Sequence, residues 1–424
     1  MAMLETLRNS MRLPGLRNRL LFTALMLVVL RVGAHIPVPG IKIDVVQAIF
    51  NKGGLLGLVD LFSGGAFKAF AIFALSVTPY INSSIIVQLL TIVIPKWEEM
   101  QKEGEEGRKK LQEYTRYGTV VLALVQAFGT GIYLKNSGAF INNTWATLIV
   151  IMISLTAGSA FLMWLGEMIT ERGIGNGISL IIFAGIVARV PSATVTLFDM
   201  LRVGQINIFQ VVLIAILAVV LIGLVVLITE GVRKIPVEYA KRVVGKRVYG
   251  GQRTHIPMKI NQAGVIPVIF AQSLLFLPQT IATYVPTSRF AQIVGQYLSG
   301  TSAWFWVLNA VFIVFFAYFY TAVTFNPEEI ADNMKKNGGF VPGYRPGRAT
   351  ADYLARISER LTLVGALFLA ALTVLPIIII NATGIQQAYL GGTALLIVVG
   401  VALETMKQIE AQLVMRHYQG FMRS

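Results

Sequence analysis

The chain contains no cysteine and only three histidines, which narrows its chemistry at once. Without cysteine there are no disulfides, no thiolate metal ligands and no nucleophilic thiol. The histidines, His35, His255 and His417, lie far apart in sequence and form no pair at metal-ligand spacing. A Walker-type phosphate loop is also missing. We therefore expect no metal, no cofactor and no enzymatic activity.

Charge is equally scarce. Asp, Glu, Lys and Arg make up 13% of the residues, against about 25% in a typical soluble domain. Hydrophobic residues reach 55% and the mean hydropathy is +0.68. These values predict an all-α polytopic membrane protein, with spans of about 20 residues each. The ten expected spans are residues 20–36, 72–94, 117–134, 145–166, 174–190, 208–229, 263–284, 303–325, 361–381 and 386–404.

The basic residues are distributed unevenly along this pattern. If the N-terminus is cytoplasmic, 28 of the 36 Lys and Arg residues lie in cytoplasmic segments. This asymmetry follows the positive-inside rule, so both termini are expected in the cytoplasm. No signal-peptide pattern precedes the first span, so we expect nothing to be removed there. The net charge of +15 is thus first a topology signal.

Ten spans divide into an N-terminal half, 1–190, and a C-terminal half, 191–424. Because five is odd, the second half must be inverted relative to the first, an arrangement common in membrane transport proteins. The interiors of the second to ninth spans contain no charged residue. Ion-coupled carriers usually contain such residues. The sequence therefore favours a passive conduit over a small-solute carrier, although both remain open at this point.

Three kinds of segment interrupt the apolar pattern. "LVDLFSGGAFKAFAIFALSVTP" (58–79) begins with a short amphipathic piece, which would suit a half-helix or an interfacial helix. Polar residues within the second and seventh spans suit either a hydrophilic pathway or contacts between helices. The loops 230–262 and 326–360 are long and basic. The first has β-branched residues and glycine turns, which predict a β-ribbon. Both loops suit RNA phosphate or an acidic protein surface, or they only fix topology.

Nine blocks taken in order resemble the SecY family, the channel subunits of the bacterial general secretory translocon. The blocks are "IPVPG" (36–40), "LFSGGA" (61–66), "SVTPYINSSIIVQLL" (76–90), "EGEEGRKK" (103–110), "MITERGIGNGISLIIFAGIV" (168–187), "KRVYGGQRTHIPMKIN" (246–261), "AGVIPVIFAQSLL" (263–275), "FVPGYRPGRAT" (340–350) and "LGGTALLIVV" (390–399). Alone, "GIGNGIS" could pass for a phosphate loop. Together, the blocks cover nearly the whole chain.

The resemblance implies two five-helix halves around a central pore, closed by a half-helix plug at about 55–70. The plug positions fall on Asp60, Leu61, Phe62, Ser63, Gly64, Gly65, Ala66 and Phe67. The apolar pore ring falls on Ile81, Ile85, Ile178, Ile182, Ile269 and Ile397. The lateral gate, between the second and seventh spans, includes Thr78, Asn82, Gln88 and Gln272. Without the resemblance, each isoleucine would suit an ordinary core.

For the cytoplasmic loops the resemblance implies docking of a partner. The positions are Lys246, Arg247, Arg345 and Arg348. The partners it implies are SecE-like and SecG-like small membrane subunits, the SecA motor ATPase, the ribosome, signal sequences and translocating polypeptides. The expected activity is passage of unfolded secretory polypeptides across the bacterial inner membrane, with lateral release of apolar segments into lipid. An insertase-like scaffold without a through-pore is the remaining alternative.

Overall fold

The computed structural model describes residues 13–51, 64–239, 242–244, 247–249, 253–285, 288–299, 302–383 and 392–421. The chain divides into two compact units. Unit 1 comprises Met1–Gln205, Gln272–Trp306 and Val401–Ser424, and unit 2 comprises Ile206–Ala271 and Val307–Gly400. The expected half 1–190 lies wholly in unit 1, while the expected half 191–424 is divided between both units. The two inverted halves remain a prediction.

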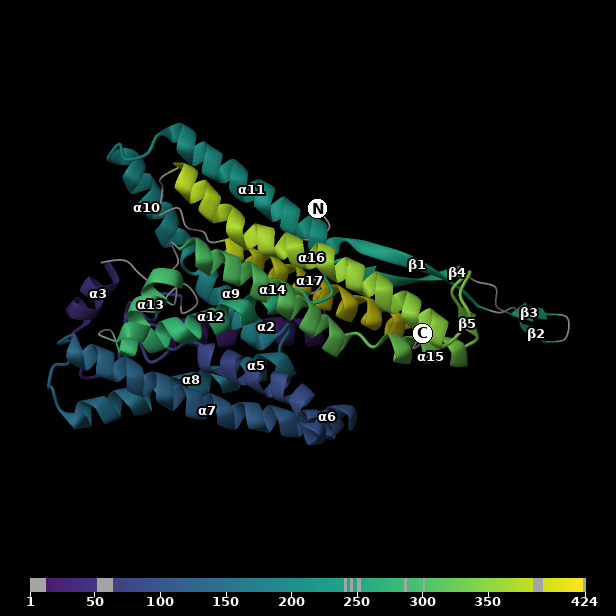
Figure 1. Ribbon diagram of the computed structural model, residues 1–424, viewed down its shortest axis with the longest axis horizontal. Helices are drawn as coiled ribbons and strands as arrows, with labels where there is room; N and C mark the ends of the chain where they lie inside the picture. The colour runs from purple at the N-terminus through teal and green to yellow at the C-terminus, as the bar shows by residue number, and fades with distance from the viewer. Residues whose placement is uncertain are drawn as a thin grey trace. The chain divides into compact units, whose positions relative to one another are not determined.

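The regular elements described in unit 1 are helices (Figure 1). Its helices are α2 (Pro14–Gly33), α3 (Ile43–Asn51), α5 (Thr78–Val93), α6 (Pro95–Lys102), α7 (Glu105–Asn136), α8 (Trp145–Arg172), α9 (Gly177–Val187), α10 (Val190–Arg202) and α13 (Arg289–Tyr297). Side-chain caps mark the N-termini of α8 and α9. The Thr144 hydroxyl accepts from the amide of Thr147, and Asn176 Oδ1 accepts from the amide of Ser179. Such caps satisfy amides that the first turn leaves free.

Unit 2 combines helices with a small sheet. Its elements are α11 (Ile208–Glu230), β1 (Val232–Tyr239), β2 (Arg242–Val244), β3 (Arg247–Tyr249), β4 (Arg253–Lys259), α15 (Pro327–Lys336), β5 (Gly339–Phe340) and α16 (Arg348–Thr383). Three further helices have residues in both units: α12 (Ile266–Tyr284), α14 (Ala303–Thr324) and α17 (Gly392–Phe421).

Each of the ten segments expected to span the membrane contains a helix. Within the described residues, six helical stretches are long and apolar enough to cross a bilayer. A seventh is possible if α5 and α6, bent by 101° at their junction, form one broken span. The helix α12 is apolar but shorter over Ile266–Ala282. The total of ten spans therefore stays a prediction.

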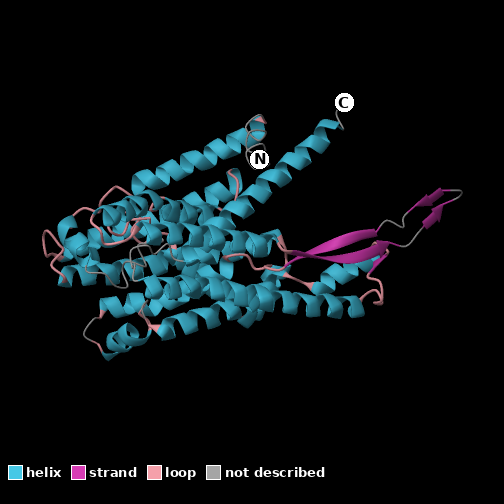
Figure 2. Cartoon of the chain, turned by 90° about the horizontal axis from the view of Figure 1, so that it is seen from above, coloured by secondary structure: helices cyan, strands magenta, loops and turns pink. Residues whose placement is uncertain are grey.

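The predicted ribbon in the loop 230–262 is confirmed. β1 pairs antiparallel with β4, from Val232 opposite Lys259 to Glu238 opposite Arg253. Figure 2 shows the two strands leaving the helices as a long ribbon. On its other edge β1 pairs with β5, so the order is β4-β1-β5. The second basic loop, 326–360, thus contributes a strand to the first, and it also holds α15 and the start of α16.

Apolar side chains from both loops form a core beneath this sheet. Ile235, Val237 and Met258 of the ribbon are 1–2% exposed. They pack with Met334, Val341 and Leu354 from the second loop. Burying such side chains stabilises by about 2 kcal/mol each. The two loops are therefore one folded platform of unit 2, not two independent excursions.

Candidate functional site

The segment before α5 differs from the expected plug helix. Asp60, Leu61, Phe62 and Ser63 lie outside the described residues. From residue 64 to 77 the chain forms successive turns, and the helix begins only at Thr78. The described part of the plug, from Gly64, is therefore not helical, and the helix of the second span starts later than residue 72. The predicted half-helix falls mainly on residues 55–63, which lie outside the described residues.

Positive φ angles explain why no helix forms there. Gly64 and Gly65 have φ values of +64° and +90°, which glycine adopts without strain. Phe70 and Ser76 have φ values of +42° and +54°, and are the non-glycine residues with positive φ in the described chain. This left-handed region costs a side-chain-bearing residue about 1–2 kcal/mol. The segment is held in a conformation that its own residues disfavour.

Backbone pairing and one guanidinium hold this segment in place. The amide of Val38 donates to the carbonyl of Phe70 at 2.9 Å, and the amide of Ile72 donates to that of Ile36 at 3.0 Å. "IPVPG" thus serves as the strand-like partner of the plug segment. Arg31, near the end of α2, donates from Nη1 to the Gly64 carbonyl at 3.2 Å. Arg31 lies within the first expected span, 20–36, and no sequence pattern indicates its partner 33 residues away.

Apolar packing completes the attachment. Phe67 and Phe70 meet edge to face, with centroids 6.2 Å apart, and Phe70 is 1% exposed. They belong to a core cluster with side chains of α7 and α8. At the other end, a Cβ on Gly64 would lie 2.8 Å from the Cα of Gly185 in α9. Glycine is therefore required where the plug segment approaches α9.

The expected pore-ring isoleucines are mostly buried. Ile81 and Ile85 share one face of α5, because they are four residues apart. Ile178 and Ile182 are similarly placed on α9, while Ile269 and Ile397 belong to unit 2. All are buried except Ile178, which is half-buried. Burial alone suits a pore ring and an ordinary core equally.

The glycine-rich loop 173–177, between α8 and α9, is not a phosphate loop. An anion site needs free amides, and here they already have acceptors within the protein. The amide of Ile174 donates to the Thr23 hydroxyl of α2 at 3.1 Å, and that of Gly175 to Gln408 Oε1 of α17 at 2.9 Å. The amide of Gly177 donates to the Thr170 hydroxyl of α8 at 2.8 Å. The loop 173–177, which we call the pivot loop, is therefore bonded to α2, α8 and α17, and it sets the direction of α9, which follows it.

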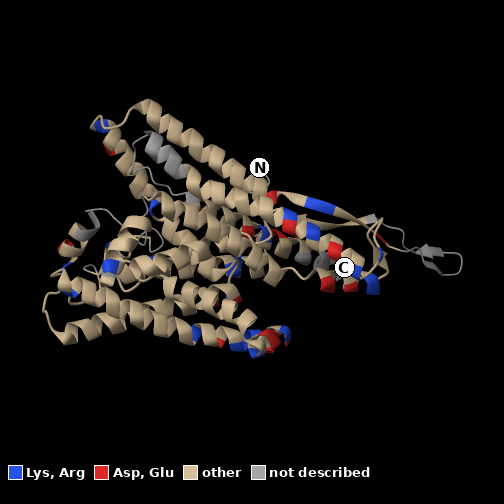
Figure 3. Ribbon diagram, in the orientation of Figure 1, with Lys and Arg blue, Asp and Glu red and all other residues tan. Residues whose placement is uncertain are grey.

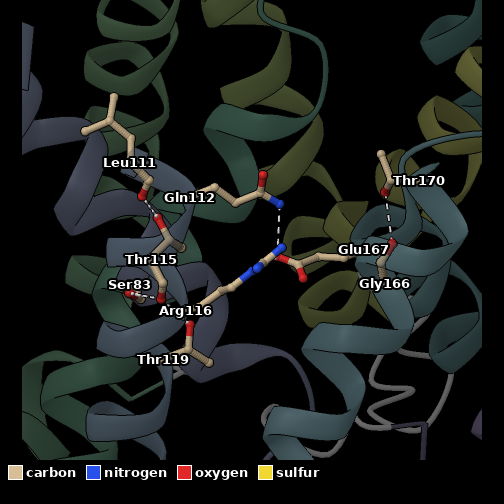
Figure 4. A network of polar contacts seen from close by, with 9 residues as sticks. All are labelled: Ser83, Leu111, Gln112, Thr115, Arg116, Thr119, Gly166, Glu167 and Thr170. Atoms are coloured by element: carbon tan, nitrogen blue, oxygen red, sulfur yellow. Dashed lines mark hydrogen bonds and ion pairs between the residues drawn. The ribbon is translucent and has the colours of Figure 1, made fainter. Parts of the chain in front are cut away.

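A polar network connects α5, α7 and α8 in the same unit (Figure 4). Ser83 donates to the carbonyl of Thr115 at 2.8 Å, which ties α5 to α7. Glu167 Oε1 of α8 accepts from Gln112 Nε2 and Arg116 Nε of α7, both at 2.9 Å. The side chain of Glu167 is 10% exposed. Sequence reasoning missed this pair, because its residues lie 51 positions apart.

The expected gate residues have varied surroundings. Asn82 and Gln272 are buried, at 4% and 6% exposure, and Thr78 begins α5. Gln88 donates to Ser84 of its own helix at 3.4 Å. Gln272 Oε1 has no hydrogen-bond partner although it is buried. An unpaired buried acceptor costs about 1–3 kcal/mol, so Gln272 reduces the stability of the folded chain.

The basic residues of the two loops are gathered on the unit 2 platform. Figure 3 shows Lys and Arg on β1, α15 and α16. Arg345 and Arg348 are exposed, and Arg348 begins α16. The Arg345 carbonyl accepts from the Thr350 hydroxyl at 2.8 Å, which fixes the turn ahead of the helix. Arg247 begins β3, whereas Lys246 lies outside the described residues.

The chain shares its fold with solved structures of channels. One solved structure, titled "The structure of a protein conducting channel", matches with a TM-score of 0.68, covering 94% of this chain and 93% of that chain at 21% identity. Another, "Sec61 in the Canine ribosome-channel complex from the endoplasmic reticulum", gives 0.59, covering 94% and 93% at 20% identity.

The sequence comparisons then identify the family. The SecY family model matches residues 71–406. The protein translocase subunit SecY of Bacillus subtilis is 46% identical over 432 residues, covering 100% of both chains. The subunit of the same name from Pseudomonas aeruginosa is 47% identical over 416 residues, covering 97% of this chain and 94% of the other. The chain belongs to the SecY family, whose members are multi-pass membrane subunits of the translocon.

Proposed function

We propose that this chain is a protein-conducting channel, which passes unfolded secretory polypeptides across the membrane and releases apolar segments laterally into lipid. The observation that carries this proposal is full-length identity of 46% to protein translocase subunits. A motor ATPase or the ribosome supplies the drive, so the chain itself is not an enzyme. Its place is the bacterial inner membrane, with both termini in the cytoplasm.

The distribution of charge supports a passive conduit. Among the described residues, no buried side chain is Asp, Glu, Lys or Arg, and Glu167, which is nearly buried at 10% exposure, lies just beyond the expected span 145–166. Coupled carriers usually bury such groups along an ion pathway. A channel for chains of any sequence needs the opposite, a lining that makes few specific contacts. Bulky apolar side chains can also close a narrow aperture by dewetting.

The plug and pore ring have distinct roles in this proposal. Asp60, Leu61, Phe62, Ser63, Gly64, Gly65, Ala66 and Phe67 close the resting pore. Ile81, Ile85, Ile178, Ile182, Ile269 and Ile397 close around a passing chain. Support comes from the strained turns that follow Gly64, which give the plug segment a reason to move. A signal sequence enters at the seam formed by Thr78, Asn82, Gln88 and Gln272.

Photo-crosslinking tests the channel. A photoreactive residue replaces Ile81 while a stalled secretory precursor occupies the membrane. The matched control is Ile86 on the same helix, which is 44% exposed where Ile81 is 8% exposed. Val219 of α11, 69% exposed, is a second control. Crosslinks to the precursor from position 81 alone support the pore ring. Equal yields from 81 and 86, or none from 81 with the precursor engaged, would reject it.

The partners act on the cytoplasmic platform. Lys246, Arg247, Arg345 and Arg348 receive the SecA motor or the ribosome, and SecE-like and SecG-like subunits complete the membrane complex. Arg345 presents a guanidinium that suits a carboxylate or phosphate. Arg345→Glu should abolish motor-driven translocation at normal protein level. Arg360→Glu, an equal charge change on exposed α16 surface, should keep it. Full transport by the Arg345 variant would exclude its docking role.

A further inference from the structure

The end of α12 is bound to α7 by a cluster of hydroxyl groups that no sequence pattern suggested. Tyr284, the last residue of α12, donates from its hydroxyl to the backbone carbonyl of Gln126 at 3.0 Å. The same hydroxyl lies 3.2 Å from Thr130 Oγ1. Thr130 Oγ1 in turn donates to the carbonyl of Gln126 at 2.8 Å. All three residues belong to unit 1.

The shape of α7 is fitted to this contact. A Cβ on Gly129 would overlap the ring carbons of Tyr284. Any larger residue at 129 would therefore push the ring away from the helix. Gly129 lets the ring lie flat against α7, which places the hydroxyl within reach of Gln126 and Thr130. Inside a membrane such polar groups have no water as an alternative partner, so they stabilise each other.

A weak point precedes the contact in α12. Pro278 lies inside the helix, six residues before Tyr284. Proline removes one helical hydrogen bond and clashes with the preceding turn, so helices bend at such positions. Beyond Pro278, Gln279 Nε2 donates to the carbonyl of Leu298 at 2.6 Å, at the end of α13. The last turns of α12 are thus attached on both sides while their link to the rest of the helix is weakened.

We propose that Tyr284, seated on Gly129 with its hydroxyl bonded to the Gln126 carbonyl and in contact with Thr130 Oγ1, is a clasp that holds α12 against α7 and sets how readily these helices part. Tyr284 is a positioning residue, because it touches no transported chain in this proposal. That the parting admits signal sequences rests on the proposed channel function. The clasp itself does not, and it can be tested separately.

The separate test is a distance measurement by double electron–electron resonance. Because the chain lacks cysteine, spin labels attach only to introduced cysteines. Val125 on α7 and Ile281 on α12 are 61% and 43% exposed and lie next to the clasp in sequence. With labels there, Tyr284→Phe should enrich a longer distance, about threefold for each interhelical hydrogen bond lost. Thr130→Val should do so less, because it leaves the bond from Tyr284 to Gln126.

Two further variants separate the clasp from general loosening. Gly129→Ala keeps every hydroxyl but displaces the ring, so the longer distance should also be enriched. Tyr318→Phe removes a hydroxyl that donates to the carbonyl of Glu359 at 3.4 Å in unit 2. It should leave the distances unchanged. Wild-type distances in both Tyr284→Phe and Thr130→Val would overturn the clasp, as would an equal shift in Tyr318→Phe.

Transport then tests the gating role. If the clasp controls entry, Tyr284→Phe should pass precursors with weakened signal sequences about threefold better than the wild type. Longer distances without any gain in such transport would overturn the gating role. A wild-type chain that conducts no precursor at all would reject the proposed function, while the distance measurement would still decide the clasp.

Discussion

Two glycine-containing segments of unit 1 are held in opposite ways. In the pivot loop, 173–177, side chains from α2, α8 and α17 accept hydrogen bonds from the backbone amides. In the plug segment, 64–77, the main chain pairs with residues 36–38 and a single guanidinium binds its first carbonyl. In the pivot loop the positive φ of +90° falls on a glycine, Gly175, which adopts it without strain. In the plug segment Phe70 and Ser76 also have positive φ angles, and these residues are strained. The pivot loop is therefore held by side chains without backbone strain, whereas the plug segment is held with backbone strain at Phe70 and Ser76.

The largest expected effect concerns Gly177, the last residue of the pivot loop. Gly177→Ala places a methyl group into the backbone carbonyl of Gly166, which cannot move aside. We expect a loss of about 3 kcal/mol, read as a lower Tm of the purified protein and less of it in the membrane. The control is Gly223→Ala on α11, where the added methyl group would meet no atom from another part of the described chain within 4 Å. That change should stabilise the helix by about 1 kcal/mol, and the same sign in both variants would contradict the prediction.

A smaller effect should follow from removing one acceptor of the pivot loop. Gln408→Ala leaves the Gly175 amide without a partner, at a cost of about 2 kcal/mol. Gln408→Glu keeps an oxygen at the same place and should retain most of the stability. Thermal unfolding of both variants measures the difference. If the two lose stability equally, the hydrogen bond is not what holds the loop.

The plug segment should respond to the loss of Arg31 in a different way. Arg31→Met removes the donor to the Gly64 carbonyl. A hydrogen bond from a charged donor contributes about 1.5 kcal/mol to the stability of the closed conformation. That energy corresponds to roughly a tenfold larger open fraction. Ion conductance in reconstituted bilayers should rise accordingly, with little change in Tm. Arg17→Met, an exposed arginine of the same helix, should keep the closed conductance, and a leak in both would assign the effect to charge alone.

The smallest expected effect concerns the strained backbone of Ser76 in the plug segment. Ser76→Gly relieves a φ of +54°, although the added freedom of the unfolded chain offsets part of the gain. A net stabilisation of about 0.5 kcal/mol should lower the background conductance. Ser84→Gly, within α5, should destabilise by about 0.5 kcal/mol instead. A Ser76→Gly variant that leaks more than the wild type would mean that the turn is not strained.

The sequence predicted those features that depend on local pattern. Apolar runs of about 20 residues located a helix in every expected span, because burial in lipid needs such lengths. β-branched residues and glycine turns located the ribbon of β1 and β4. The turns at 64–77 could not be anticipated, because the left-handed conformations of Phe70 and Ser76 oppose their intrinsic preference and are imposed by surrounding packing.

The contacts that position the site are mostly distant in sequence. Tyr284 and Gln126 are 158 residues apart, and Gly175 and Gln408 are 233 residues apart. A single tyrosine or glutamine at a span end has no pattern that names its partner. The same holds for β5, a two-residue strand that pairs with β1 across about a hundred residues. The sequence therefore predicts where helices and strands lie, but it does not predict the hydrogen bonds that connect them.

The pairing of β5 with β1 has a mechanical consequence. Strand hydrogen bonds are stiff along the sheet, and β1 follows α11 after a single residue. Since β5 precedes α16 along the chain, the pairing of β5 with β1 connects α16 to α11 through two strands. A partner bound at either loop, as proposed above, would therefore act on the same two helices, α11 and α16.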